Sequence, residues 1–160
     1  MQKLSSKEFM QEIEATLGGY WLSDLANFCS ILFHHFNDVS WVGFYLSDGK
    51  MLRLAQFMGK PACTEIGFHR GVCGTSFSQA KPLLVDNVND FAGHIACDSL
   101  AQSEMVLPFY VQESLVGVLD LDSHSPARFK KEDLELVSQA LQILSRKLAH
   151  AQPLFLNLKG

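Results

Sequence analysis

The stretch EMVLPFYVQESLVGVLDLDS, residues 104–123, decides the fold of this chain. Residues 104–111 and 115–123 are rich in apolar side chains, and a short polar segment separates them, which is typical of a β-hairpin. In the second run, Asp120 and Asp122 alternate with leucines. Because side chains alternate along a strand, we expect both carboxylates on one face of a sheet and the leucines in the core on the other face.

A second hairpin is predicted upstream. Residues 40–47, SWVGFYLS, and residues 51–58, MLRLAQFM, lie on either side of an Asp-Gly pair, which favours a tight turn. The period of two places Trp41 and Tyr45 on one face of the first strand and the apolar residues between and after them on the other.

Helical patterns mark both ends of the chain. Helices are expected within residues 5–36, and a strongly periodic C-terminal helix within residues 130–150. Residues 40–123 would supply the sheet and the active-site loops, with an irregular stretch at 59–104. This order indicates an α+β fold in which helices pack mainly on one face of an antiparallel sheet, and residues 1–160 are expected to form a single domain.

Composition excludes several classes of function. The net charge is −4, and no basic stretch is longer than RFKK, so a nucleic-acid partner is not expected. No run of about 18 apolar residues is present, so no membrane span is expected. The N-terminal segment carries Glu8, Glu12 and Glu14 where a signal peptide needs an apolar core. We therefore expect a cytoplasmic protein.

Four cysteines are the most informative reactive residues. Cys29 lies on the apolar stripe of a predicted helix and is expected to pack in the core. Cys63, Cys73 and Cys97 form no C-x-x-C pair, and their spacing matches no familiar zinc signature. A permanent disulfide framework is improbable in a reducing compartment, so core packing, metal ligation and redox chemistry all stay open for these three residues.

Local sequence gives two of these thiols possible partners. His94 and Cys97 are three positions apart in residues 93–98, GHIACD, a spacing that a thiol–imidazole pair could use in a helical turn, although such pairs are more often structural. Cys73 lies in RGVCGT, which can begin a helix. Backbone N–H groups there, together with Arg70, would lower the pKa of its thiol.

Three carboxylates can share one face of the predicted sheet. Asp120 and Asp122 lie on the same strand face, and Glu104 begins the partner strand of their hairpin. With Trp41 and Tyr45 as walls, they would form a pocket for a small cation such as an ammonium group. The alternative is a solvent-facing polar edge. No metal is expected, because calcium loops place more ligands at tighter spacing.

Six ordered motifs resemble one known family. Over about residues 8 to 149, the chain closely resembles the free methionine-(R)-sulfoxide reductases, which are stand-alone enzymes of the GAF fold. The resemblance implies a GAF-like fold with a central antiparallel sheet of about six strands. The motifs that carry it are WVGFYL, GKPAC, RGVCGT, GHIACD, SE-x-V-x-P and GVLDLDS.

The resemblance also implies a role for each candidate residue. Cys97 matches the catalytic cysteine, Cys63 the principal resolving cysteine, and Cys73 a third cysteine implicated in recycling. The residues that match the pocket are Glu104, Asp120 and Asp122 as its carboxylates, and Trp41 and Tyr45 as its aromatic wall.

The implied reaction is the thiol-dependent reduction of free L-methionine-(R)-S-oxide. Cys97 attacks the sulfur and becomes a sulfenic acid, which Cys63 resolves as a Cys63–Cys97 disulfide. A thioredoxin-type reductant then recycles the enzyme without a bound cofactor, and a homodimer is implied. Two alternatives are a non-catalytic GAF module that senses a small ligand or redox state, and a structural zinc site built from Cys63, Cys73, Cys97 and a histidine.

Overall fold

A computed structural model describes residues 4–158 and shows a six-stranded antiparallel sheet. The strand order is β3-β2-β1-β6-β5-β4, so the two predicted hairpins meet where β1 pairs with β6. The strands are β1 (Trp41–Ser47), β2 (Met51–Met58), β3 (Glu65–Gly67), β4 (Leu83–Val85), β5 (Ser103–Val111) and β6 (Ser114–Ser123).

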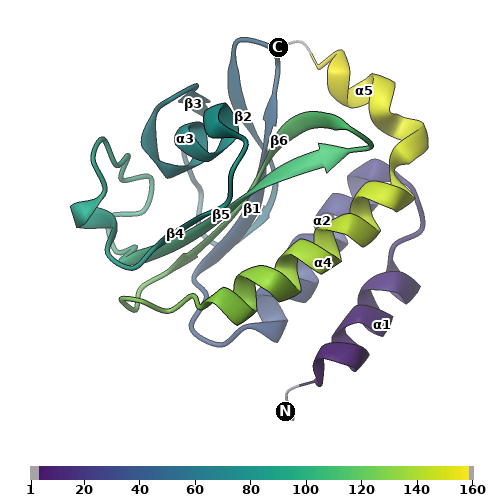
Figure 1. Ribbon diagram of the computed structural model, residues 1–160, viewed down its shortest axis with the longest axis horizontal. Helices are drawn as coiled ribbons and strands as arrows, with labels where there is room; N and C mark the ends of the chain where they lie inside the picture. The colour runs from purple at the N-terminus through teal and green to yellow at the C-terminus, as the bar shows by residue number, and fades with distance from the viewer. Residues whose placement is uncertain (1–3, 159–160) are drawn as a thin grey trace.

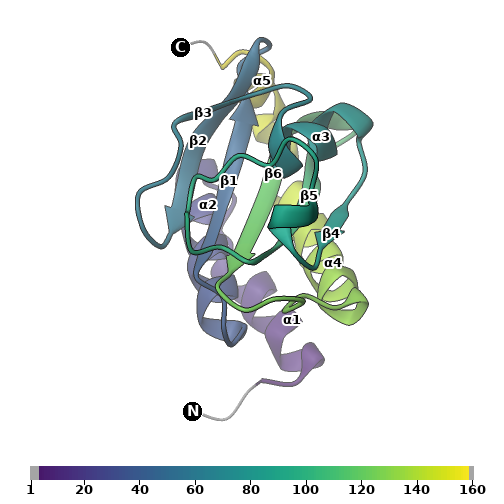
Figure 2. The ribbon, with the colours of Figure 1, turned by 90° about the vertical axis from the view of Figure 1, so that its left-hand side faces the viewer.

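The helices lie unequally on the two faces of this sheet (Figures 1 and 2). On one face, α2 packs against β1 and β2 and α4 packs against β5, with α1 and α5 beside them. On the other face lie α3, over β5 and β6, and the long connection before β5. The helices are α1 (Ser6–Thr16), α2 (Trp21–His35), α3 (Gly71–Gln79), α4 (Lys131–Lys147) and α5 (Gln152–Leu156), with short 3₁₀ turns η1 (Val88–Asp90) and η2 (Ala149–Ala151). The α+β prediction is confirmed.

Strand alternation divides the buried residues into two clusters. Val42, Phe44, Leu119 and Leu121 lie in the larger cluster, between the sheet and α1, α2 and α4. Trp41 and Tyr45 lie in the smaller cluster, on the face covered by α3. Both predicted face assignments are therefore correct, and the second face is the one that carries polar chemistry.

Local sequence explains where the first helix begins. Ser5 caps α1 through a reciprocal pair of hydrogen bonds: its hydroxyl accepts from the Glu8 N–H, and the Glu8 carboxylate accepts from the Ser5 N–H. The apolar stripe of α1 buries Phe9 and Ile13 completely. Among the described residues, no helix is both long and apolar enough to cross a membrane.

Two elements were not predicted. Strand β3 has only three residues, which is too short for a period of two to be recognised, and it forms because it pairs with β2. Helix α5 follows the predicted C-terminal helix, and it buries Phe155 edge-on against Trp21 at 5.8 Å between ring centroids. Residues 1–3 and 159–160 of the predicted domain lie outside the described residues.

Candidate active site

A cavity of about 270 Å³ opens on the face of the sheet that α3 covers. Its walls come from β1, the segment after β2, the start of α3, the connection before β5, and the ends of β5 and β6. Seven of the eight residues predicted for the site line it: Trp41, Tyr45, Cys73, Cys97, Glu104, Asp120 and Asp122. The eighth, Cys63, reaches the site through a disulfide to Cys97.

Strand register brings the three carboxylates together. Asp122 lies directly opposite Glu104 on β5 and opposite Trp41 on β1, so these three side chains share one face of the sheet. Asp120 lies two residues along the same strand and therefore points to the same face. Glu104 and Asp120 are each only 6% exposed. The structure therefore brings the three carboxylates together at the cavity, with Glu104 and Asp120 buried and Asp122 half-buried.

Burial changes the charge state of this cluster. Loss of solvation raises the pKa of Asp120 to about 7, and it raises the pKa values of Glu104 and Asp122 well above their ordinary range. The charge on Asp120 raises the pKa values of both neighbours further. The three groups therefore titrate as a set, and at neutral pH the cluster retains protons that free carboxyl groups would have lost.

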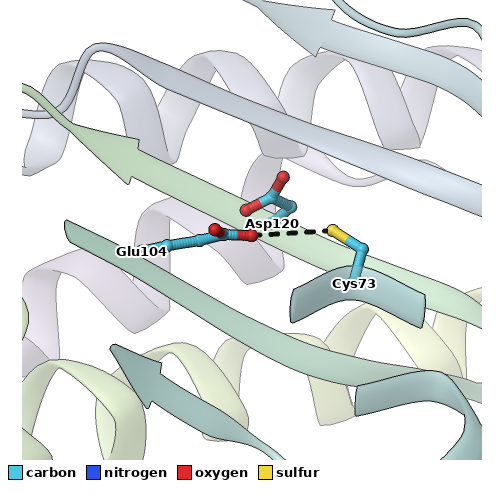
Figure 3. Close-up of side chains that lie close together, drawn as sticks. All are labelled: Cys73, Glu104 and Asp120. Carbon is cyan, nitrogen blue, oxygen red and sulfur yellow. Dashed lines mark hydrogen bonds between the residues drawn. The ribbon is translucent and has the colours of Figure 1, made fainter. Parts of the chain in front are cut away.

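Cys73 faces the carboxylates from α3. Its Sγ lies 3.9 Å from Oε1 of Glu104, and its side chain is buried (Figure 3). The expectation that the helix start and Arg70 lower the pKa of this thiol is wrong. Burial, followed by the nearby Asp120, Glu104 and Asp122, raises its pKa well above the ordinary value. Cys73 is therefore a protonated thiol in this state.

Cys63 and Cys97 form a disulfide across 34 positions of sequence, with their Cα atoms 5.3 Å apart. The bond joins the segment after β2 to the connection before β5. It also takes two of the thiols that a structural zinc site with Cys73 would need. Cys29 is 1% exposed in the larger buried cluster, where its Sγ donates to the Gln56 carbonyl at 3.3 Å, so its predicted packing role is confirmed.

The aromatic pair does more than form a wall. Trp41 and Tyr45 stack with ring centroids 5.9 Å apart. The indole Nε1 of Trp41 donates to the Lys60 carbonyl, and the Tyr45 hydroxyl donates to the Cys63 carbonyl, both at 3.0 Å. These two hydrogen bonds hold the segment that carries Cys63 against the cavity. Gly43 makes room for the indole, because a Cβ there would lie 2.2 Å from a Trp41 ring carbon.

Comparison with known proteins agrees with this geometry. A GAF domain matches residues 22–148. The free methionine-R-sulfoxide reductase of Escherichia coli is 41% identical over 81% of this chain and 78% of its own length. The free methionine-R-sulfoxide reductase of Neisseria meningitidis, solved in complex with its substrate, is 37% identical, with a TM-score of 0.86 over 92% of this chain and 91% of that one. The chain belongs to the free methionine-R-sulfoxide reductase family of GAF domains.

A further structure supports the assignment. The fRMsr protein of Staphylococcus aureus, solved in its reduced form, has a TM-score of 0.87 at 33% identity over 91% of this chain and 96% of that one. The family resemblance inferred from the six sequence motifs is therefore confirmed, as is the GAF-like fold.

The connection that carries Cys97 contacts other elements on both sides of this residue. His94 Nε2 lies 3.8 Å from Oε2 of Glu104, and burial lowers the pKa of this imidazole, which favours its neutral form. Because Cys97 Sγ is bonded to Cys63, the thiol–imidazole pair considered from the spacing is not formed in this state. On the other side of Cys97, Asp98 meets the ring of His124 at 2.8 Å.

Three charged or titratable lining residues were not singled out from the sequence. They are Lys60, Asp98 and His124. Asp98 directly follows Cys97, and His124 directly follows the hairpin at residues 104–123. Their positions beside predicted site residues could have indicated a role in the cavity. Their mutual contact depends on how the connection folds back, which no local pattern encodes.

Proposed function

We propose that the protein reduces free L-methionine-(R)-S-oxide to L-methionine with its own thiols as the reductant. The observation that carries this proposal is a Cys63–Cys97 disulfide at a cavity lined by the carboxylates of Glu104, Asp120 and Asp122. Membership of the reductase family and the substrate-bound relative from Neisseria meningitidis support it.

The first half-reaction transfers oxygen to Cys97. The Cys97 sulfur attacks the sulfoxide sulfur while the sulfoxide oxygen takes up a proton. The sulfur–oxygen bond of the substrate and the transient bond between the two sulfurs then break, and the oxygen ends bonded to the Cys97 sulfur as a sulfenic acid. The substrate sulfur gains two electrons and leaves as the thioether of methionine, and Cys97 loses the same two electrons.

A neutral carboxyl group supplies the proton that makes the sulfur open to attack. Burial and the neighbouring charge favour protonated Glu104 and Asp122 at neutral pH, and both line the cavity. We assign the proton donor to one of these two residues. Those members of the cluster that are ionised bind the ammonium group of the substrate.

The same cluster explains a preference for the free amino acid. A methionine within a protein has an amide in place of the ammonium group, so ionised carboxylates would face no positive partner. The free energy lost when the carboxylates give up their water would then not be offset. Backbone N–H groups in residues 94–105 are proposed to bind the substrate carboxylate. Lys60 and Arg70 also line the cavity, and their positive charges complement the negative charge of the substrate carboxylate.

The second half-reaction restores the thiols. Cys63 attacks Sγ of the Cys97 sulfenic acid, water leaves, and the disulfide forms. An external dithiol of the thioredoxin type then reduces this disulfide by exchange, with no bound cofactor. Cys73 is proposed to take part in recycling. We place residues 1–160 as one catalytic domain that acts as a homodimer in the cytoplasm, where reduced dithiols are available.

A diastereomer assay tests the proposal. Reduced protein is supplied with the R or the S form of free methionine sulfoxide and with thioredoxin or dithiothreitol, and methionine is quantified. We expect turnover of the R form alone, and none with Cys97→Ser. The matched control is Cys29→Ala, which removes a thiol outside the cavity and is expected to keep turnover. Turnover by Cys97→Ser would overturn the nucleophile assignment, and tight binding without turnover would support a ligand-sensing module.

A further inference from the structure

Three potential metal ligands converge on the floor of the cavity, and each comes from a different element. Cys73 on α3, Glu104 on β5 and Asp120 on β6 place one ligand atom each within 4.8 Å of the others, and all three residues are buried. In Figure 3 the two carboxyl groups and the thiol point toward one another across the sheet. No sequence signature marks this set, because its members are far apart along the chain.

An unpartnered oxygen indicates that this cluster has room for a ligand. In the part of the chain that the structure describes, Oδ1 of Asp120 is fully buried and has no hydrogen-bond partner. Asp120 is only 6% exposed, so water contributes little in place of the missing hydrogen bond to Oδ1. A buried acceptor left unpaired costs on the order of 1–3 kcal/mol, and such an atom in a native site needs an explanation. A bound cation would remove the cost.

The donor atoms select among cations. Magnesium and calcium take oxygen ligands, whereas zinc accepts thiolate sulfur together with carboxylate oxygen. Bond lengths of about 2.3 Å to sulfur and 2.1 Å to oxygen require a sulfur–oxygen separation of about 3.6 Å around a tetrahedral ion. Cys73 Sγ and Glu104 Oε1 are 3.9 Å apart, so only a small closure is needed. His94 is not one of the three converging ligands, although its Nε2 lies 3.8 Å from the other oxygen of Glu104.

We propose that Cys73, Glu104 and Asp120 form a binding site for Zn²⁺, and that the bound ion excludes the ammonium group of an amino acid from the same cavity. The thiol proton of Cys73 and any carboxyl proton are released to solvent when the ion binds. One thiolate and two carboxylates then surround a divalent charge. Zinc binding itself does not depend on the proposed reductase function, but the exclusion of an amino acid does.

The disulfide form of the protein gives a clean test of zinc binding. With Cys63 and Cys97 joined, the thiols left among the four cysteines are Cys73 in the cavity and Cys29 outside it. A thiol count on unfolded protein verifies this state. Zinc affinity is then measured by competition with a chromophoric chelator, and Co²⁺ is added in parallel to detect a thiolate-to-cobalt absorption band in the near ultraviolet.

We expect about one zinc per chain and a cobalt band, and no competition by Mg²⁺. Cys73→Ser and Asp120→Asn should each weaken zinc binding about tenfold or more, and Cys73→Ser should abolish the cobalt band. Cys29→Ala is the matched control and should keep both signals. Equal zinc affinity in the wild type and Cys73→Ser, or loss of the band with Cys29→Ala, would overturn the site.

A second arm tests exclusion. Zinc affinity is measured with saturating free L-methionine-(R)-S-oxide and with its N-acetyl derivative, which lacks the ammonium group. We expect the free amino acid to weaken zinc binding and the derivative to leave it unchanged. Unchanged zinc affinity in both cases would contradict the exclusion. A protein that binds zinc at Cys73 but turns over no sulfoxide would contradict the proposed reductase function and leave the metal site standing.

Discussion

At the scale of single residues, Asp120 decides the charge of the cavity floor. Burial raises its pKa to about 7, whereas an unfolded aspartate titrates near 4. Between these two values the folded protein holds a proton that the unfolded chain has released. The stability contributed by this protonated group is therefore fully present below about pH 4 and is lost as the pH rises through about 7.

Asp120→Asn should accordingly stabilise the protein at high pH. Asparagine carries no charge, so the variant does not pay the cost of burying a carboxylate. We expect its free energy of unfolding to exceed that of the wild type by on the order of 2–4 kcal/mol at pH 8, and the gap to shrink steadily as the pH falls toward 5. Urea unfolding of both proteins in the disulfide form, repeated across this pH range, measures the gap.

The matched control is Glu113→Gln, which removes an exposed carboxyl group from the turn between β5 and β6. This control should show no comparable gap at any pH. A gap for Asp120→Asn that stays constant from pH 5 to pH 8 would contradict the elevated pKa, because it would mean that Asp120 has the same charge in the folded and unfolded protein across that range.

At the scale of elements, α3 places Cys73 over the sheet because its backbone approaches the strands closely. Gly74 permits this approach: a Cβ at this position would lie 2.4 Å from the Gly67 carbonyl oxygen at the end of β3. The same oxygen accepts from the Arg70 N–H at 3.1 Å, so the turn that leads into α3 is tied to β3. The position of Cys73 relative to Glu104 therefore depends on one glycine.

Gly74→Ala should displace α3 and weaken the protein. Because the clash is with a backbone atom, it cannot be relieved by a side-chain rotation, and we expect a loss of stability of about 1–3 kcal/mol. Chemical denaturation measures this loss. Gly18→Ala is the matched control, since nothing lies within 4 Å of a Cβ added there. Equal stability of the two variants would contradict the close approach described for α3.

At the scale of the whole molecule, the two faces of the sheet have different roles: one stabilises the fold and the other carries the cavity. One face carries the large apolar cluster under α1, α2 and α4, which stabilises the fold. The other face carries the cavity, and its covering consists of α3 and a long connection instead of a continuous helical layer. The Cys63–Cys97 bond joins two segments of this covering. Reduction of that bond removes the covalent link between the two segments, which suits the proposed cycle in which Cys97 reacts first with a substrate and then with Cys63.

Much of this arrangement could be predicted from sequence because it depends on alternation. The hairpin at 104–123 fixed which residues face the cavity, and the six motifs supplied the family. What could not be predicted depends on tertiary contact. The raised pKa of Cys73 reflects its burial and then the carboxylates of β5 and β6, which together outweigh the local effect of its helix start. The pairing of Asp98 with His124 and the packing of Phe155 in α5 likewise need the folded chain.

The proposed reaction depends on two steps: Cys97 takes oxygen from the sulfoxide, and Cys63 then resolves the sulfenic acid on Cys97. A single-turnover experiment tests it most directly: reduced protein, freed of external thiols, is mixed with the R sulfoxide, quenched, and analysed for methionine and by peptide mass spectrometry. We expect about one methionine per chain, matched by a Cys63–Cys97 disulfide. With Cys63→Ser we expect the same methionine and a sulfenic acid trapped on Cys97. Methionine released without any oxidation of Cys97 would contradict the account.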